Sequence, residues 1–117
     1  MISQRDIIEV PFNLPQGIIH HPAIVLSNND AIREEEAFIA LMLTTEKAND
    51  LYTFEITSDM VSKKLHVPYC EARLHLISFF RTKETVPNSH YNNKIKQEFF
   101  EELIKQVNRI TFGLELL

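Results

Sequence analysis

Two adjacent histidines precede a proline in the first third of the chain. His20 and His21 stand before Pro22 in the apolar run 18–28. Histidine changes its charge near neutral pH, so it can act as a general acid, a general base or a cation. If the run is a strand, the two imidazoles point to opposite faces, and only one of them can face a cleft. A turn residue or a partly buried side chain is the alternative for either histidine.

A pair of threonines marks the end of another apolar run. Thr44 is the last residue of the run 37–44, and Thr45 follows it. Hydroxyl groups at the end of a strand can donate hydrogen bonds to a phosphate oxygen. The high β-propensity of threonine explains the same pair equally well.

Positive charge gathers in the second half of the chain. Residues 1–62 carry three basic and ten acidic side chains, whereas residues 63–117 carry nine basic and six acidic ones. The cations of interest are Lys47, Lys63, Lys64, Arg73, Arg81 and Lys83. Their grouping predicts either a polyanionic or acidic partner or a solvated face. The net charge of −4 excludes a protein that coats nucleic acids generally.

Composition excludes several other classes. The chain has 117 residues, of which 44% are apolar and 24% charged, which predicts one globular domain over 1–117. The apolar runs are too short to cross a bilayer and the first residues are unlike a signal peptide, so a cytoplasmic location is expected. The remaining candidate ligands are His66, His75, His90 and Cys70. They lack a recognised metal-ligand spacing, so no metal or cofactor is expected.

Five short strands are expected to position these residues. Runs rich in β-branched, aromatic and alternating apolar residues predict strands at 5–12, 18–28, 37–44, 52–57 and 72–80. Polar stretches predict loops at 28–35, 58–69 and 82–93. Pro22 lacks the N–H for a ladder bond, so the second strand either begins near it or has an open edge there. The run 37–44 predicts a central strand, with a short helix as the competing interpretation.

A helical period appears near the C-terminal end. Apolar residues recur every three or four positions at Ile95, Phe99, Leu103, Val107 and Ile110. This spacing predicts an amphipathic helix from about residue 93 to 111. The order of elements predicts a mainly β fold, in which an antiparallel sheet curls into a small barrel that limits its free edges.

Three parts of the sequence together resemble a known family. The string RDIIEVPF (5–12) precedes HHPAIVLSN (20–28), Leu43-Thr44-Thr45 follows, and YTFEIT (52–57) leads to ARLHLIS (72–78). In this order they resemble the PemK/MazF-like toxins, in which a Gly-Asp-hydrophobic strand precedes an Arg-Pro-Ala-hydrophobic-Val-Leu-Ser strand. The matching residues of the first two strings are Asp6, Pro22, Ala23, Val25, Leu26 and Ser27.

The resemblance implies a fold, an activity and partners. The fold would be a small SH3-like, partly closed antiparallel barrel with a C-terminal α-helix, paired as a homodimer that covers side chains such as Phe79 and Phe80. The activity would be metal-independent endoribonuclease cleavage of single-stranded RNA, inhibited by a cognate antitoxin peptide that lies across the RNA groove. The implied catalytic residues are His21, Thr44 and Thr45. The implied RNA- or antitoxin-binding residues are His20, Lys47, Lys63, Lys64 and Arg73.

Two residues depart from the family pattern. Arg5 replaces the usual glycine before Asp6, and His21 replaces an arginine that has a catalytic role. Arginine is always charged and suits the doubly charged phosphorane of RNA cleavage, whereas histidine is partly charged but can move protons. His21 therefore indicates either a different chemistry or a member without cleavage. Two competing functions stay open, namely a catalytically silent barrel that binds a peptide or nucleic acid, and a homodimeric interaction protein.

Overall fold

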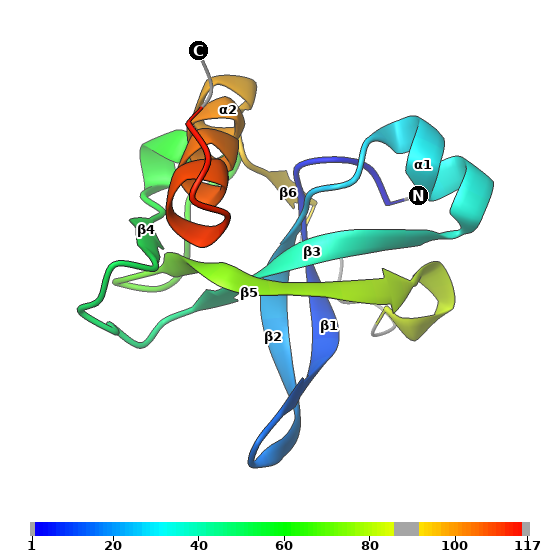
Figure 1. Cartoon of the computed structure of the whole chain (residues 1–117), viewed down its shortest axis with the longest axis horizontal. Helices are drawn as coiled ribbons and strands as arrows, with labels where there is room; N and C mark the ends of the chain where they lie inside the picture. Colours follow the sequence, from blue (N-terminus) through cyan, green and yellow to red (C-terminus); the bar gives the residue numbers. More distant parts are fainter. Residues whose placement is uncertain (1, 86–91, 116–117) are drawn as a thin grey trace.

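Six antiparallel strands form one curled sheet (Figure 1). The structure is a computed structural model, and it describes residues 2–85 and 92–115. The strands are β1 (Asp6–Leu14), β2 (Gly17–Val25), β3 (Ala37–Thr44), β4 (Thr53–Glu55), β5 (Glu71–Arg81) and β6 (Asn93–Lys94). They lie in the order β4-β5-β3-β2-β1-β6. The mainly β, antiparallel fold predicted from the sequence is thus confirmed.

A single bridge spans the space between the two edge strands. Val61, which follows β4 and a 3₁₀ turn (Ser58–Met60), pairs with Ile95, which follows β6. Two backbone bonds flank this bridge, since Ser62 N–H donates to the Lys94 carbonyl (2.9 Å) and Lys96 N–H donates to the Met60 carbonyl (2.8 Å). This bridge joins the segments that follow β4 and β6, but the sheet itself is not closed, so the barrel expected from the sequence is an open, curled sheet.

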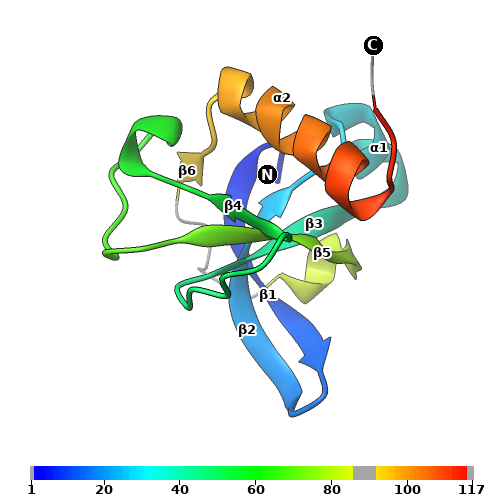
Figure 2. The same cartoon turned by 60° about the vertical axis from the view of Figure 1, so that its left-hand side comes forward.

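Side chains from the two faces of the sheet enter two separate cores. One core contains Ile7, Ile24, Leu41, Leu43 and Leu74 together with Phe100 and Leu103 of α2 (Gln97–Gln106). The other contains Ile8, Val10, Phe12, Val25, Phe38 and Phe80 together with Ile32 of α1 (Asn29–Glu35). Figure 2 shows α2 lying over β4 and β5. Alternation along each strand divides the apolar residues between the two helices.

The helix α1 corrects the loop predicted at 28–35. Asn28 caps it, because its side-chain oxygen accepts a hydrogen bond from Ala31 N–H at 2.8 Å. Asp30 in the first turn forms an ion pair with Arg33 (2.6 Å), and Ile32 is buried beneath the helix. Capping and one buried side chain are enough for a two-turn helix that packs on a sheet.

The C-terminal helix begins later than its apolar spacing predicted. Asn93 and Lys94 pair with β1 instead, opposite Ile7 and Asp6. Ile95 fits the helical spacing, yet it is fully buried in the bridge to Val61. The helix α2 starts at Gln97 and continues as a π-helical turn (Val107–Thr111). The predicted end near residue 111 is confirmed, and the predicted start at 93 is wrong because β-pairing takes those residues.

Arg5 occupies a backbone position that suits glycine. Its φ is +76°, in the left-handed region, and its N–H donates to the Val25 carbonyl at 2.8 Å. A residue with a Cβ pays about 1–2 kcal/mol for this conformation. The guanidinium donates a hydrogen bond to the Ile95 carbonyl (3.0 Å). Arg5 thus combines a strained backbone with a side-chain contact that glycine cannot make.

Pro22 lies where β2 separates from β3. Residues 17–22 of β2 pair with β1, and pairing with β3 extends only over Ala23–Val25. The open edge predicted at Pro22 is confirmed. The pairing of β3 with β5 also shifts register between Leu41 and Leu43. The end of β3 therefore diverges from β2, which leaves space between them.

Candidate functional site

A hollow of about 410 Å³ lies between the diverging strands β2 and β3. It is lined by Ile7, His21, Pro22, Leu43, Thr44, Thr45, Glu46, Lys63, Lys64, Leu65, His66, Val67, Cys70 and Asn93. These residues come from β1, β2, the end of β3, the segment before β5 and β6. Its lining is mainly apolar and also includes the Thr44 and Thr45 hydroxyls, the cations Lys63 and Lys64, and the carboxylate Glu46.

Most of the residues predicted for the site meet at this hollow. His21, Thr44 and Thr45, which the resemblance implied as catalytic, all line it. Lys63 and Lys64 line it as well, and both are exposed. Five side chains that are up to 43 positions apart in the sequence are thus gathered at one place.

Three other residues predicted for the site lie outside the hollow within the described part of the chain. His20 is exposed on β2 and points to the opposite face from His21. The ammonium group of Lys47 lies 5.7 Å from the centre of the Tyr69 ring, in a cation–π contact. Arg73 is only 8% exposed, and its contacts are internal.

His21 lines the hollow but is half-buried opposite Val10 in the β1–β2 pairing, so its side chain lies on the face of the core that contains Val10 and Phe12. Its imidazole makes an edge contact with the ring of Phe12, with 6.1 Å between ring centres and an angle of 77°. Phe12 is itself 4% exposed. This contact restrains the imidazole, and Pro22 next to it leaves the strand edge open.

The threonine at the end of β3 is held by a local turn. Glu46 N–H donates a hydrogen bond to the Thr44 hydroxyl oxygen at 3.2 Å. Because the oxygen accepts this bond, the hydroxyl proton can be donated to a ligand. Thr44 is half-buried and Thr45 is exposed. The pair therefore presents hydroxyl groups at the rim of the hollow.

Cys70 lines the hollow without being activated. The thiol belongs to a residue that is 7% exposed, and burial, with a smaller effect from the Glu71 carboxylate, raises its pKa to about 11. The thiol is therefore protonated at neutral pH, and a protonated thiol is a poor nucleophile. Cys70 acts as an apolar lining residue.

Arg73 belongs to a buried ion cluster beside the hollow. Its guanidinium bonds to Asp50 (2.7 Å) and Glu71 (3.0 Å). Glu71 is fully buried, and it also accepts hydrogen bonds from the Thr53 hydroxyl (2.8 Å) and the Tyr69 hydroxyl (2.8 Å). A cation that is paired with two carboxylates has little attraction left for a phosphate.

The charges of this cluster are mutually stabilised. The hydrogen bond from Arg73 lowers the pKa of Asp50 well below its usual range. Burial raises the pKa of Glu71. The hydrogen bonds that its carboxylate accepts, led by those from Thr53 and Tyr69, outweigh the effect of burial and lower this pKa overall. Burial and the bond to Glu71 raise the pKa of Tyr69 to about 12. The carboxylates are thus ionised and the phenol is neutral at physiological pH.

The cluster fastens the loop that leads away from Thr44 and Thr45. Glu71 accepts a hydrogen bond from Ala48 N–H (3.1 Å), and Asp50 accepts one from Tyr52 N–H (2.9 Å). Arg73 on β5 therefore orders the segment between β3 and β4 through its two carboxylate partners. Its position indicates a structural task at the back of the site.

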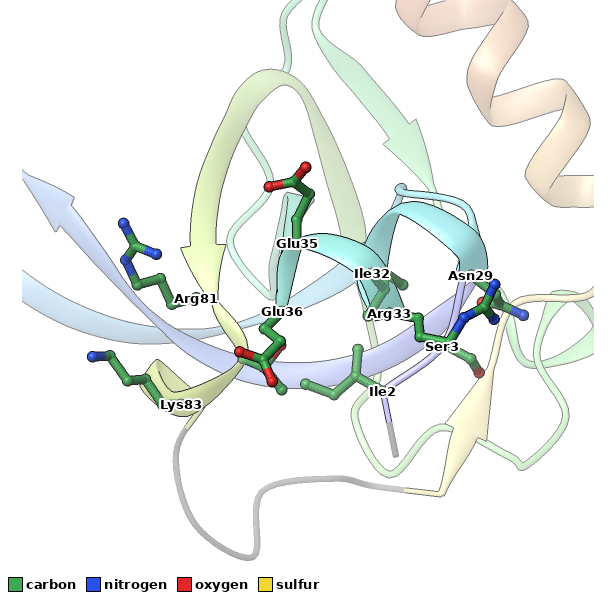
Figure 3. A pocket seen from close by; sticks show the side chains of 10 residues that line it. Ile2, Ser3, Asn29, Ile32, Arg33, Glu35, Glu36, Arg81 and Lys83 are labelled. Carbon is green, nitrogen blue, oxygen red and sulfur yellow. The ribbon is translucent and has the colours of Figure 1, made fainter.

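A second hollow of about 810 Å³ lies between α1 and the turn after β5 (Figure 3). Ile2 and Ile32 supply apolar surface there, and Arg33, Glu35, Glu36, Arg81 and Lys83 supply charges of both signs. None of the residues predicted to be catalytic is among its lining in the described part of the chain. The predicted catalytic residues therefore lie at the smaller hollow and not at this larger one.

Metal-binding groups are not assembled in the described residues. Among residues 2–85 and 92–115, no group of three or more His, Cys, Asp or Glu side chains could hold a metal ion. His90, one of the candidate ligands from the sequence, lies outside the described residues. In the same part of the chain, no helix is long and apolar enough to cross a membrane.

Asn93 is a polar lining residue that the sequence did not reveal. It is 8% exposed and lies opposite Ile7 in the pairing of β1 and β6. The sequence placed it at the start of a helix, where an asparagine is unremarkable as a cap. The available signal in the sequence was its position two residues before Ile95, an apolar residue that fits both strand and helix patterns.

Solved structures reproduce this architecture along the whole chain. An endoribonuclease in complex with its cognate antitoxin from a mycobacterial species matches with a TM-score of 0.72 at 16% identity, covering 100% of both chains. MazF from Deinococcus radiodurans matches with a TM-score of 0.74 at 9% identity, covering 97% of each chain. A MazE-MazF complex from the same organism matches with a TM-score of 0.69 at 9% identity, covering 97% of this chain and 98% of that one.

The chain has a MazF-like fold. No family model and no curated protein matches the sequence. The similarity therefore lies in the fold, and the chemistry has to be argued from the residues of the hollow. In this MazF-like fold, the hollow is the place where the predicted catalytic residues and two exposed lysines come together.

Proposed function

We propose that this chain is a toxin-like endoribonuclease of a toxin–antitoxin pair, which cleaves single-stranded RNA in the cytoplasm without a metal ion. One observation carries the proposal: His21, Thr44, Thr45, Lys63 and Lys64 line a single hollow on a MazF-like fold. A basic groove beside His21 and Thr44 is the feature that favours a nuclease over a silent binding barrel.

The residues of the hollow match the requirements of RNA cleavage by the neighbouring 2′-hydroxyl. A base removes the 2′-OH proton, the 2′-oxygen attacks phosphorus, and an acid protonates the 5′-oxygen as it leaves. The products are a 2′,3′-cyclic phosphate and a free 5′-hydroxyl. His21 serves as the proton-transfer group, and Thr44 donates a hydrogen bond to a phosphate oxygen. The Lys63 and Lys64 ammonium groups offset the negative charge of the phosphorane.

Replacing the histidine tests the catalytic assignment. We expect His21→Ala to lower cleavage of a single-stranded RNA by at least about 100-fold, the usual contribution of a general acid or base. His75→Ala is the matched control, because His75 is exposed and stacks on Tyr52 outside the hollow (4.3 Å between ring centres). Wild-type activity should persist in EDTA. Equal cleavage by His21→Ala and wild type would disprove the assignment.

A pH profile separates histidine chemistry from simple charge stabilisation. We expect wild-type cleavage to change between about pH 5 and 8, where histidine side chains change charge. His21→Arg should flatten the profile, because a guanidinium keeps its charge throughout this range. A profile that is identical in wild type and His21→Arg would show that the proton moves through another group.

An antitoxin peptide is the proposed protein partner. Two of the similar structures are complexes, one of an endoribonuclease with its cognate antitoxin and one of MazE with MazF. In this chain, the exposed Lys63 and Lys64 beside a mainly apolar lining suit a peptide that carries acidic and apolar side chains. Such a peptide should compete with RNA for the hollow in an anisotropy assay.

A homodimer is proposed from an uncovered part of the sheet. Ile39 and Phe79 lie opposite each other on β3 and β5, and they are 41% and 59% exposed. Phe80, expected at the same surface, is instead 3% exposed in the core with Phe38. We expect light scattering to give twice the monomer mass of 13.7 kDa. Phe79→Ser should lower the mass towards the monomer, whereas Ile18→Ser at the β1–β2 hairpin should not.

A further inference from the structure

The side chain of Asn93 is paired with the backbone of a residue thirty positions earlier. Its Oδ1 accepts a hydrogen bond from Lys63 N–H (2.9 Å), and its Nδ2 donates one to the Lys63 carbonyl (2.9 Å). The same Oδ1 accepts a bond from the Ser62 hydroxyl (3.0 Å). One buried amide thus contacts both polar backbone groups of Lys63, as a residue of a neighbouring strand would.

This contact lies where the backbone pairing ends. Val61 bridges Ile95, and Ser62 N–H donates to the Lys94 carbonyl as the next backbone bond (2.9 Å). The Asn93 side chain supplies the following pair of bonds to Lys63. The chain then leaves β6 and runs along the hollow through Lys64 and Leu65. Asn93 therefore determines the direction in which this segment enters the rim.

We propose that Asn93 is a positioning residue that holds Lys63 and Lys64 at the hollow so that their ammonium groups meet an RNA phosphate. The inference rests on the proposed function, because it assumes that RNA occupies the hollow. Free lysine side chains lose much rotamer entropy on binding, and a fixed backbone removes part of the ordering cost. Asn93 itself acts through the two lysines.

The Asn93 amide supplies both the acceptor and the donor that pair with the backbone of Lys63. Aspartate keeps the acceptor for Lys63 N–H but loses the donor for the Lys63 carbonyl. Alanine loses both bonds and leaves the partly buried N–H and carbonyl of Lys63 without this partner. We therefore expect Asn93→Ala to change RNA binding more than Asn93→Asp does, although position 93 contributes no positive charge.

A double-mutant cycle tests the inference. The probe is a fluorescein-labelled, single-stranded 12-nucleotide RNA with 2′-O-methyl groups, which cannot be cleaved through the 2′-oxygen. We expect the double variant Lys63→Ala, Lys64→Ala to bind it about tenfold more weakly, with a salt slope reduced by about 1.4. Asn93→Ala should reproduce most of both changes. Combining all three substitutions should weaken binding no further than the lysine pair alone.

Additive effects in this cycle would overturn the inference while leaving the proposed function intact. Failure of the wild-type protein to bind the RNA probe in 50 mM salt would overturn the proposed function instead. The control Asn13→Ala, at the exposed end of β1, should leave affinity and salt slope unchanged. If Asn93→Ala does not fold, the uncharged Asn93→Ser replaces it in the cycle with the same expected sign.

Amide hydrogen exchange tests the contact without RNA. The Lys63 amide should exchange slowly in the wild-type protein, because its hydrogen bond to Asn93 is partly buried. In a folded Asn93→Ser variant, whose side chain is too short to span both groups, the same amide should exchange faster. Equal exchange rates in the two proteins would overturn the inference.

Discussion

Two regions of the molecule carry cations that look alike in the sequence and differ in the fold. Lys63 and Lys64 are exposed at the rim of the hollow. Arg73 is 8% exposed and is bonded to Asp50 and Glu71. Both regions belong to the basic second half of the chain. Only the first leaves its positive charge available to a ligand.

The difference shows that the partners of a charge decide its role. Asp50 precedes Arg73 by 23 positions, so the pairing depends on how the β3–β4 loop folds back onto β5. Glu71 lies two positions away on the same strand and the same face. A count of cations along the sequence includes the paired and the free ones alike. The fold separates a charge that stabilises the loop from charges that can bind phosphate.

Removing the buried cation should have the largest effect on stability. Arg73→Met leaves the fully buried Glu71 carboxylate without its ion partner. We expect the free energy of unfolding to fall by about 3–5 kcal/mol, as for other broken buried pairs. Urea unfolding at pH 7 measures this loss. The exposed Arg109→Met on the π-helical turn is the control, and an equal effect of both substitutions would contradict the comparison.

Acid should weaken the same cluster by a smaller amount. The pKa values of Asp50 and Glu71 are lowered in the folded protein. Carboxylates with lowered pKa values stabilise the fold above their unfolded pKa, and that contribution is lost as the pH falls through the folded values. We therefore expect wild-type stability to decline below about pH 5, in urea titrations from pH 7 to pH 3. A wild-type stability that is constant down to pH 3 would contradict the ion cluster.

Neutralising the exposed cations should affect binding and spare the fold. Lys63→Ala with Lys64→Ala should weaken binding of the uncleavable RNA about tenfold. The free energy of unfolding should stay within about 0.5 kcal/mol of wild type, because neither side chain is buried. Calorimetry and anisotropy on the same samples check both parts. A large loss of stability would place these lysines in the same class as Arg73.

Arg5 offers the smallest and most specific test, since its guanidinium bonds to a backbone carbonyl instead of a carboxylate. Arg5→Ala loses that bond and keeps the left-handed backbone at φ +76°. Arg5→Gly loses the same bond and relieves the backbone. We expect the glycine variant to be more stable than the alanine variant by about 1 kcal/mol, measured by thermal unfolding. Equal stabilities would indicate that the backbone at residue 5 relaxes.

Much of the fold was predictable because apolar alternation follows the pleat of a strand. The run that contains Phe38 predicted a central strand, with a short helix as the alternative, and the run that contains Leu74 predicted a strand. Pro22 predicted either a strand start or an open edge, and the structure has the open edge. The helix α1 was missed because Ile32 is its only buried residue, and its main signal is the Asn28 cap. The strand β6 was missed because Ile95 satisfies a helical spacing, while its actual partner Val61 is far away in the sequence.

The resemblance implied some of the residues that line the hollow. His21 beside Pro22 and Thr44 at the end of β3 both lie at the hollow. The roles of Arg73 and Asn93 could not be predicted, because each depends on a contact with a distant loop. A local sequence pattern describes one element at a time. The hollow, in contrast, forms where β2 and β3 diverge and where β6 pairs with β1.

The late position of β6 in the chain has a consequence for the timing of synthesis. A polypeptide leaves the ribosome from its N-terminal end, so His21, Thr44 and Lys63 emerge well before Asn93. Until Asn93 and Ile95 arrive, Ile7 lacks its partner in β6 and Val61 lacks its bridge. A nascent chain therefore carries these lining residues of the hollow before it has Asn93, which completes the lining. The hollow becomes complete only after most of the polypeptide has been made.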